Sequence, residues 1–127
     1  MDQRAQKVLW IDGGAGSIAG IFVLLLRDWL ARLHGFPLAL VVFLGIANLS
    51  YGSYSGSLAL RATRGKAPSR RAVLILIAAN LAWVGVCATV LSRTTPTAFG
   101  FIHVGFEALF VGTLALVEYR LVLPTVR

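Results

Sequence analysis

His103 and Glu107 are the residues of this sequence whose types and spacing most directly suggest chemistry. They lie four positions apart in an apolar segment, so a helix would place both side chains on one face. Such a pair could relay protons, act as acid and base, or contribute two ligands to a divalent metal ion. We favour a structural role, in which the two side chains bond to each other and to Asn48 or Asn80 and so hold neighbouring helices together. We predict no catalytic residue. We also predict no metal site, because two ligands are too few for a metal ion.

Other polar residues also lie inside apolar segments, where an ionisable or amide group needs a partner or a water-filled cavity. A helix rises about 1.5 Å per residue, which allows the depths of these residues to be compared. By this measure Asp12 lies level with Tyr51. His103 lies level with Cys87, while Glu107 lies near the middle together with two asparagines. The candidate residues of a ligand- or proton-binding site are therefore Asp12, Asn48, Tyr51, Asn80, His103 and Glu107.

Several polar and aromatic residues have a simple structural explanation, which we prefer. Asp12 would complement the dipole at the start of its helix or pair with a nearby basic residue. The serines among residues 48–57 would donate hydrogen bonds to backbone carbonyls one turn earlier. Alternatively, their hydroxyls would line a polar cavity or pore. Trp83 would pack in the core beside Asn80. His34 would be a solvated residue in the short connection between the first two spans.

The segments that contain these residues are long, apolar and almost free of charge. Hydrophobic residues make up 57% of the chain and charged residues 13%, against about 45–50% and 25% in a typical soluble domain. A helix of about 20 residues is needed to cross the ~30 Å hydrocarbon layer of a membrane, and four segments are long enough. The sequence therefore predicts an all-α fold, in which residues 1–127 form one integral membrane four-helix bundle. The predicted spans are approximately residues 8–28, 36–60, 72–92 and 97–119, with Pro124 preventing extension of the last.

Basic residues concentrate at one set of helix ends and predict the orientation of the chain. Nine of the twelve lysines and arginines lie in the two terminal segments and the linker 61–71, and three lie in the two short connections. The positive-inside rule then places both termini and the linker in the cytoplasm. We expect the bundle to lie in the inner membrane of a bacterium. We expect the lipid bilayer as partner, with anionic headgroups contacting Arg61, Arg64, Lys66, Arg70 and Arg71.

The net charge of +7 would also suit a nucleic-acid-binding protein, but we discard that partner. Nucleic-acid-binding surfaces gather their basic residues on one face, often with interleaved aromatic residues. Here the basic residues sit at the ends of the spans instead. The charge is therefore better explained by membrane orientation than by nucleic acid.

Glycines in the first span predict close helix packing. Gly16 and Gly20 are four residues apart, a spacing that lets two helix backbones approach closely in lipid, and Gly13 belongs to the same small-residue segment. Because this face would need a partner, we consider a homodimer. Gly20 and Gly85 also hold the same position relative to a preceding basic segment, which would suit two helical hairpins in a parallel repeat.

Three functional hypotheses follow from these residues. The leading hypothesis is a non-catalytic binding or interaction protein that uses the bundle as a scaffold. The first alternative is a small proton-coupled transporter or channel with Glu107 as the titrating group. The second alternative is a haem- or metal-binding protein that uses His103 and Glu107. We predict no cofactor, because the two histidines lie in a loop and a span and would not both bind one haem, the alternative being a haem bound through His103 alone. The sequence contains no phosphate-binding glycine loop, His-Glu-x-x-His motif or nucleophile elbow.

Two short motifs give the chain a resemblance to known membrane proteins. Residues 80–83 read Asn-Leu-Ala-Trp in the third span, and residues 96–100 read Pro-Thr-Ala-Phe-Gly at the start of the fourth. With these motifs the chain resembles small uncharacterised four-span bacterial inner-membrane proteins over most of its length. The resemblance implies the architecture and no activity. The small multidrug resistance transporters are similar only in size, because their essential glutamate lies in the first span, where this chain has Asp12.

Overall fold

Four long apolar helices make up most of the protein. A computed structural model describes all residues 1–127, with five α-helices and no β-strand. The helices are α1 (Gln3–Leu25), α2 (Arg27–His34), α3 (Leu38–Thr63), α4 (Arg70–Arg93) and α5 (Ala98–Val117). All except α2 are long and apolar enough to cross a membrane, the last when it is counted through to Thr125. The predicted all-α class and the four long apolar helices are therefore confirmed.

The first helix differs from its predicted span at both ends. α1 begins at Gln3, because the side chain of Asp2 caps it by accepting a hydrogen bond from the N–H of Ala5 at 2.7 Å. It also ends before the predicted boundary, and the chain bends into α2. We expected a simple connection here, but Asp28 in the first turn and basic residues in the last turn complement the dipole of a short helix. α2 ends at His34 and is capped by Gly35, whose φ of 70° is left-handed.

Helices α3 and α4 extend into the segment predicted to be a linker. Only residues 64–69 connect them, so the predicted linker 61–71 overlaps a helix end on each side. The connection turns at Gly65, whose φ of 75° is left-handed. Ser69 caps α4 by accepting a hydrogen bond from the N–H of Ala72 at 3.2 Å. The basic residues predicted to contact lipid headgroups are all exposed here, namely Arg61, Arg64, Lys66, Arg70 and Arg71.

The last helical segment continues past its predicted end. We expected it to stop near Tyr119, with Pro124 preventing extension, and that expectation is wrong. After α5 the chain continues as a π-helical turn, Glu118–Val122, and then as a 3₁₀ turn, Leu123–Thr125. Pro124 is accommodated because it lies at the start of the 3₁₀ turn, where a backbone N–H is not needed.

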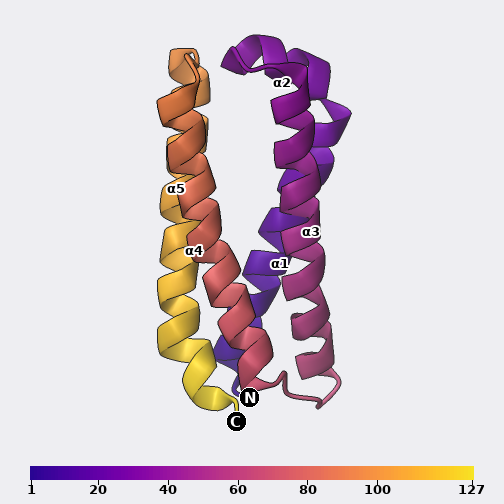
Figure 1. Ribbon diagram of the computed structural model, residues 1–127. Helices are drawn as coiled ribbons and strands as arrows, with labels where there is room; N and C mark the ends of the chain where they lie inside the picture. Colours follow the sequence, from indigo (N-terminus) through magenta and orange to yellow (C-terminus); the bar gives the residue numbers. More distant parts are fainter.

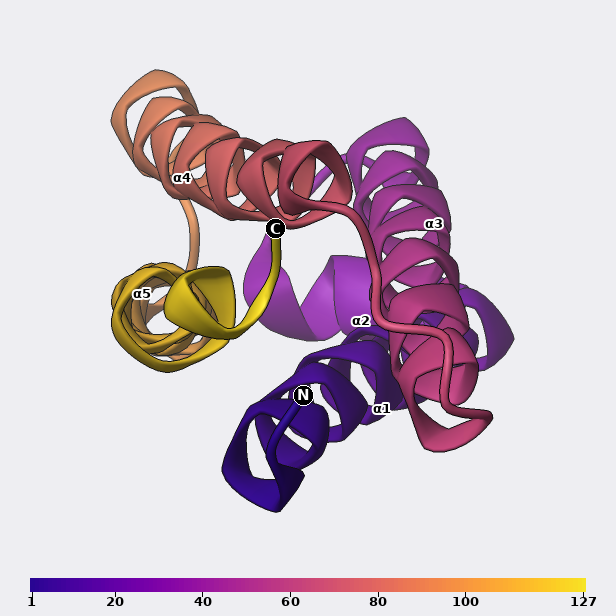
Figure 2. The ribbon, with the colours of Figure 1, turned by 90° about the horizontal axis from the view of Figure 1, so that it is seen from below.

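The chain forms two helical hairpins that lie side by side. Figure 1 shows α1 packed along α3 and α4 packed along α5, with both termini at one end of the bundle, which we call the terminal end. Helix α2 lies at the opposite end, the α2 end, and Figure 2 shows it lying across the bundle. One cluster of buried side chains at the terminal end includes Leu9 and Leu76, and a second at the α2 end includes Trp83 and Cys87.

Glycines bring the backbones of α1 and α3 into direct contact. A Cβ atom at Gly16 would lie 2.9 Å from the Cα of Gly52, and one at Gly13 would lie 2.7 Å from the Cα of Gly56. Gly20 is equally close to α3. The three glycines proposed as packing residues therefore pack within one chain. Because α3 covers this face, the face gives no support to the homodimer that we considered.

The second hairpin does not repeat these glycine contacts. Gly85 and Gly105 have no atom within 4 Å of an added Cβ. Side chains of both helices, such as Val90 and Val104, instead belong to one core cluster. The two hairpins share an up-and-down course (Figure 1), but Gly85 and Gly105 do not make the close backbone contacts of the glycines in the first hairpin.

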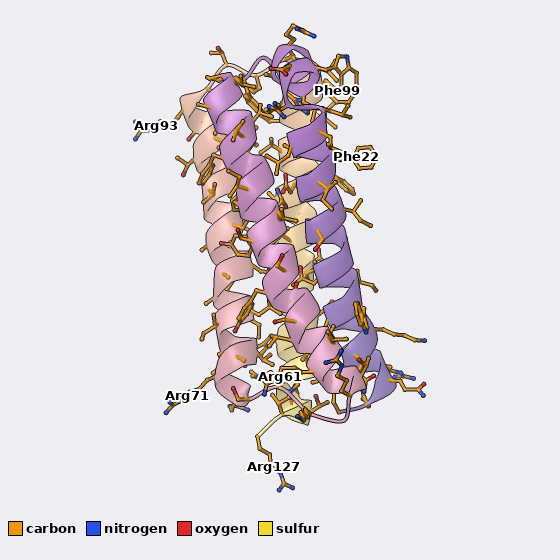
Figure 3. All side chains as sticks on the ribbon, turned by 90° about the vertical axis from the view of Figure 1, so that its right-hand side faces the viewer. Phe22, Arg61, Arg71, Arg93, Phe99 and Arg127 are labelled. Carbon is orange, nitrogen blue, oxygen red and sulfur yellow. The ribbon has the colours of Figure 1, made fainter.

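Arginine side chains lie at the ends of the bundle, and apolar side chains cover its flanks. Figure 3 shows Arg61, Arg71 and Arg127 at the terminal end, Arg93 near the other end, and Phe22 pointing outward from α1. Large exposed apolar side chains occur on all four long helices, among them Ile18, Phe43, Leu81 and Phe106. A surface of this kind is suited to lipid rather than to water.

Candidate functional site

A cavity of about 180 Å³ lies between the two hairpins and is lined by α1, α3, α4 and α5. On the α1 side its wall includes small residues, Ala15, Gly16 and Ala19, which leave the space open because none has a side chain beyond Cβ. Aromatic residues of the second hairpin, including Trp83 and Phe110, line the same space. The structure brings all six candidate residues from the sequence onto this cavity: Asp12, Asn48, Tyr51, Asn80, His103 and Glu107.

Glu107 is bonded to an indole rather than to the partners expected from the sequence. The Nε1–H of Trp83 donates to Oε1 of Glu107 at 3.0 Å and joins α4 to α5. Trp83 is only 3% exposed, and its ring centroid lies 5.5 Å from that of Tyr51. The structure shows this bond in place of the predicted one to His103 or an asparagine. Glu107 is therefore half-buried and lines the cavity, and one of its carboxyl oxygens accepts a hydrogen bond from a core residue.

Asp12 belongs to a buried polar cluster that joins three helical segments. Nδ2 of Asn80 donates to Oδ2 of Asp12 at 3.3 Å and to Oε2 of Glu118 at 3.0 Å. All three side chains are at most 6% exposed, and Oε1 of Glu118 has no hydrogen-bond partner in the chain. The preferred interpretation of Asp12, as a group that complements its helix dipole or pairs with a basic residue, is wrong, because the carboxyl is buried against α4.

Glu118 is a site residue that sequence reasoning missed. It lies at the start of the π-helical turn and is fully buried. A signal was present, because Glu118 follows Glu107 by eleven residues and three helical turns return a side chain to nearly the same face. Its position beside the predicted helix end at Tyr119 obscured that signal. π-helical turns occur frequently at functional sites, which fits the position of Glu118 next to the cavity.

His34 and His103 are in contact at the α2 end of the cavity. Nε2 of His34 lies 2.7 Å from Nδ1 of His103, and Nδ1 of His34 lies 2.8 Å from the carbonyl oxygen of Leu30. A carbonyl only accepts, so Nδ1 of His34 has the hydrogen, and in the neutral ring its Nε2 accepts from Nδ1 of His103. A neutral His103 then keeps Nε2 as an acceptor. The predicted solvated loop position of His34 is wrong, since this side chain is 3% exposed.

The end of α2 is held against the start of α5 by backbone contacts. The N–H of Thr97 donates to the carbonyl of His34 at 2.9 Å, and its hydroxyl donates to the carbonyl of Leu33 at 2.7 Å. Gly100 permits this approach, because an added Cβ would lie 3.0 Å from the Cα of His34. These contacts place His34 beside His103, and hydropathy alone does not reveal them.

The two residues that first suggested chemistry do not bond to each other. His103 bonds to α2 and Glu107 bonds to α4, although both line one cavity. Cys87, predicted to lie level with His103, is fully buried in the core and does not line the cavity. Asn48 lines the cavity and donates to the carbonyl of Leu44 in its own helix at 3.0 Å.

The serines of α3 are satisfied as predicted. The hydroxyls donate to backbone carbonyls three or four residues earlier in the same helix, at Ser50, Ser53, Ser55 and Ser57. Of residues 48–57, only Asn48 and Tyr51 line the cavity. This half of α3 therefore contributes two polar groups to the site rather than a continuous polar wall.

The arrangement suits ligand binding better than metal or haem binding. No group of three or more His, Cys, Asp or Glu side chains is placed to hold a metal ion. His34 and His103 touch each other, which leaves no room for an iron atom between their nitrogens. Comparison of the chain with protein-family models, curated proteins and solved structures finds no match.

Proposed function

We propose that this protein is a multi-pass protein of the bacterial inner membrane, with both termini in the cytoplasm, which binds a small ligand within the bilayer and catalyses no reaction. Four helices long and apolar enough to span a membrane support the location, together with the exposed apolar side chains on their flanks. Both termini lie at the same end of the bundle as the basic α3–α4 connection (Figure 1), which supports the orientation.

The main support for ligand binding is the cavity between the hairpins. Ligand sites in proteins are concave, mostly apolar and supplied with a few polar groups, and this cavity combines apolar walls with six polar side chains. Polar groups that only joined helices would be satisfied by one another. Here Glu107 and Tyr51 line the cavity while only partly buried, and His103 is exposed.

Binding is favoured over catalysis by the way the polar groups are held. A general acid and a general base must both reach the reacting part of a substrate. His103 and Glu107 are fixed by bonds to different helices, α2 and α4. The cavity lining also contains no serine, threonine or cysteine that could act as a nucleophile. The site therefore offers recognition without an evident reaction.

Quenching of Trp83 fluorescence by bromobenzene tests ligand binding. The combined substitutions Trp10→Phe and Trp29→Phe leave Trp83 as the only tryptophan, and bromobenzene in the cavity would quench its ring by contact. We expect saturable quenching of the protein in a non-ionic detergent. Ala19→Leu, made in this background, partly fills the cavity and should weaken binding at least about tenfold.

Ala82→Leu is the matched control for this experiment, because Ala82 is exposed on α4 and does not line the cavity. It adds the same volume as Ala19→Leu and should leave the quenching curve unchanged. Quenching that rises without saturation, and equally in all three proteins, would contradict ligand binding. Such behaviour is expected from quencher that reaches Trp83 only through the detergent.

Cysteine labelling tests the proposed orientation. Cys87→Ala removes the native thiol, and a single cysteine is then introduced by Ser69→Cys at the terminal end or by Thr95→Cys at the α2 end. An impermeant maleimide should label Thr95→Cys while the inner membrane is intact, and should label Ser69→Cys only after that membrane is opened. The reverse pattern would overturn the orientation.

Proton-coupled transport is a second candidate, because ionisable groups lie on both sides of the cavity. His34 and His103 lie toward the α2 end, and Asp12 and Glu118 lie toward the terminal end, with Glu107 between them along the bundle. In liposomes that contain a pH-sensitive dye, the wild-type protein should dissipate an imposed pH gradient faster than Glu107→Gln. Equal rates at equal amounts of inserted protein would contradict this candidate.

A further inference from the structure

The cavity has acidic side chains in its lining and no lysine or arginine. Asp12 and Glu107 line it, and Glu118 shares the amide of Asn80 with Asp12. These are three of the five acidic residues of the chain. None of the twelve lysines and arginines lines the cavity. An anionic ligand would therefore be repelled, whereas a cationic ligand would be attracted.

The carboxyl groups of this region have no cationic partner within the chain. Glu107 accepts one hydrogen bond from an indole, and Asp12 accepts one from an amide. Oε1 of Glu118 is buried and has no partner in the chain. An ionised carboxyl group in apolar surroundings is costly unless a countercharge lies close to it. A cationic ligand in the cavity would supply that countercharge to Asp12 and Glu107, the two carboxyl groups that line it.

Aromatic rings provide walls that suit a cation with an apolar body. Tyr51, Trp83, Phe106 and Phe110 all line the cavity. The faces of such rings attract ammonium groups through their quadrupole. A primary ammonium group would also need several hydrogen-bond acceptors to replace its lost hydration, whereas a substituted ammonium group needs few. Because the rings also offer apolar contacts to its substituents, the lining suits a substituted ammonium group.

The cavity is accessible from the flank of the bundle. Phe106 and Phe110 line the cavity and are also 67% and 36% exposed. The facing wall on α1 has small side chains, including Ala15 and Ala19. In the proposed membrane location, a hydrophobic molecule dissolved in the bilayer could reach the carboxyl groups between α1 and α5. This route suits an amphipathic ligand better than a strongly hydrated ion.

From these observations we infer that the cavity binds a small hydrophobic organic cation. Its substituted ammonium group would lie near Glu107 and Asp12, and its apolar body would lie against the aromatic side chains. This inference rests on the proposed function, because it specifies the ligand class of the same cavity. The carboxyl groups favour a ligand with a positive charge, and the small residues of α1 set the size of ligand that the cavity accepts.

Two probes of the same shape and different charge test this inference. Benzyltrimethylammonium has a permanent positive charge, whereas 2,2-dimethylpropylbenzene has carbon in place of nitrogen and is neutral. Each probe is titrated as a competitor of bromobenzene in the protein with Trp83 as its only tryptophan, with concentrations corrected for partition into the detergent. We expect the cation to bind at least about tenfold more tightly than the neutral probe.

Substitution of the acidic residues identifies the source of this preference. Glu107→Gln keeps the shape of the side chain and removes its charge, so it should weaken binding of the cation at least about tenfold and leave the neutral probe unaffected. Asp28→Asn is the control, because Asp28 is exposed on α2 and does not line the cavity. If Glu107→Gln does not fold, Asp12→Asn makes the same test from the α1 wall.

The outcomes distinguish this inference from the proposed function. Equal affinity for the two probes would overturn the organic cation and leave a ligand-binding cavity in place. Absence of saturable bromobenzene quenching would remove both. Tight binding of the cation that persists in Glu107→Gln and in Asp12→Asn would also overturn the inference, because the charge would then be recognised elsewhere.

Discussion

The two helical hairpins bury their facing surfaces by different means. In the first hairpin, α1 and α3 meet through their backbones, because glycines such as Gly16 and Gly52 face each other. In the second hairpin, α4 and α5 meet through side chains, and Trp83 donates to Glu107 across the interface. Gly85, the counterpart of a first-hairpin glycine, has open space around an added Cβ.

This contrast separates the residues that set helix positions from those that provide chemistry. The glycine interface offers no side chain to a ligand, but it fixes α1, whose small residues form one wall of the cavity. The second hairpin provides four of the ionisable and amide groups of the site, namely Asn80, His103, Glu107 and Glu118. Steric changes should therefore act most strongly on the first hairpin, and changes of polar groups should act most strongly on the second.

One added methyl group should distinguish the two hairpins with the largest effect. Gly52→Ala would place a Cβ against the backbone of Ser17 and Gly16, so α1 and α3 would have to separate. We expect a loss of about 3 kcal/mol in the free energy of unfolding, as in overpacked cores. Gly105→Ala adds the same methyl group in open space and should stabilise by up to about 1 kcal/mol, because alanine favours helix over glycine.

Thermal unfolding in detergent, followed by circular dichroism, measures both variants against the wild-type protein. The Tm should fall for Gly52→Ala and stay level or rise for Gly105→Ala. A decrease of similar size in both variants would show that the two hairpins pack alike, contrary to the glycine contacts.

An intermediate effect is expected where the two hairpins are joined. Asn80 of α4 donates to Asp12 of α1 and to Glu118, so Asn80→Ala would leave two buried carboxyl groups without their donor. We expect a cost of about 2 kcal/mol in the free energy of unfolding. Asn48→Ala is the comparison, because the amide of Asn48 donates within its own helix and its loss should cost less than about 1 kcal/mol. Equal costs from the same unfolding measurement would argue against a polar link between the hairpins.

The long helices are predictable from sequence because they depend on length and hydropathy. Their ends are less predictable, because single contacts decide them. Asp2 extends α1 by capping it, and Pro124 is accepted because the chain changes to a 3₁₀ turn. Helix α2 was not predicted, because a hydrogen bond from Thr97 to the carbonyl of Leu33 holds its end, and such a contact does not show in the hydropathy of the sequence.

The composition of the site is more predictable than its pairing. Asp12, Asn80 and Glu107 were recognised because polar groups in apolar segments need an explanation. Their partners were not recognised, because residue counting gives the depth of a side chain and leaves the rotation of one helix against the next undetermined. Glu107 therefore proved to pair with Trp83, at a position that sequence reasoning had assigned to the core.

The smallest effect is expected at the α2 end, where α2 connects the two helices of the first hairpin and docks on the second. The hydroxyl of Thr97 donates to the carbonyl of Leu33 and accepts from the N–H of Gly100. Thr97→Val removes both bonds and should cost about 1 kcal/mol or less. In hydrogen exchange, the amides of α2 should exchange up to about fivefold faster. Thr113→Val is the control, because the hydroxyl of Thr113 bonds only within α5. If the exchange of the α2 amides is unchanged in both variants, other contacts, such as that of His34 with His103, hold α2 in place.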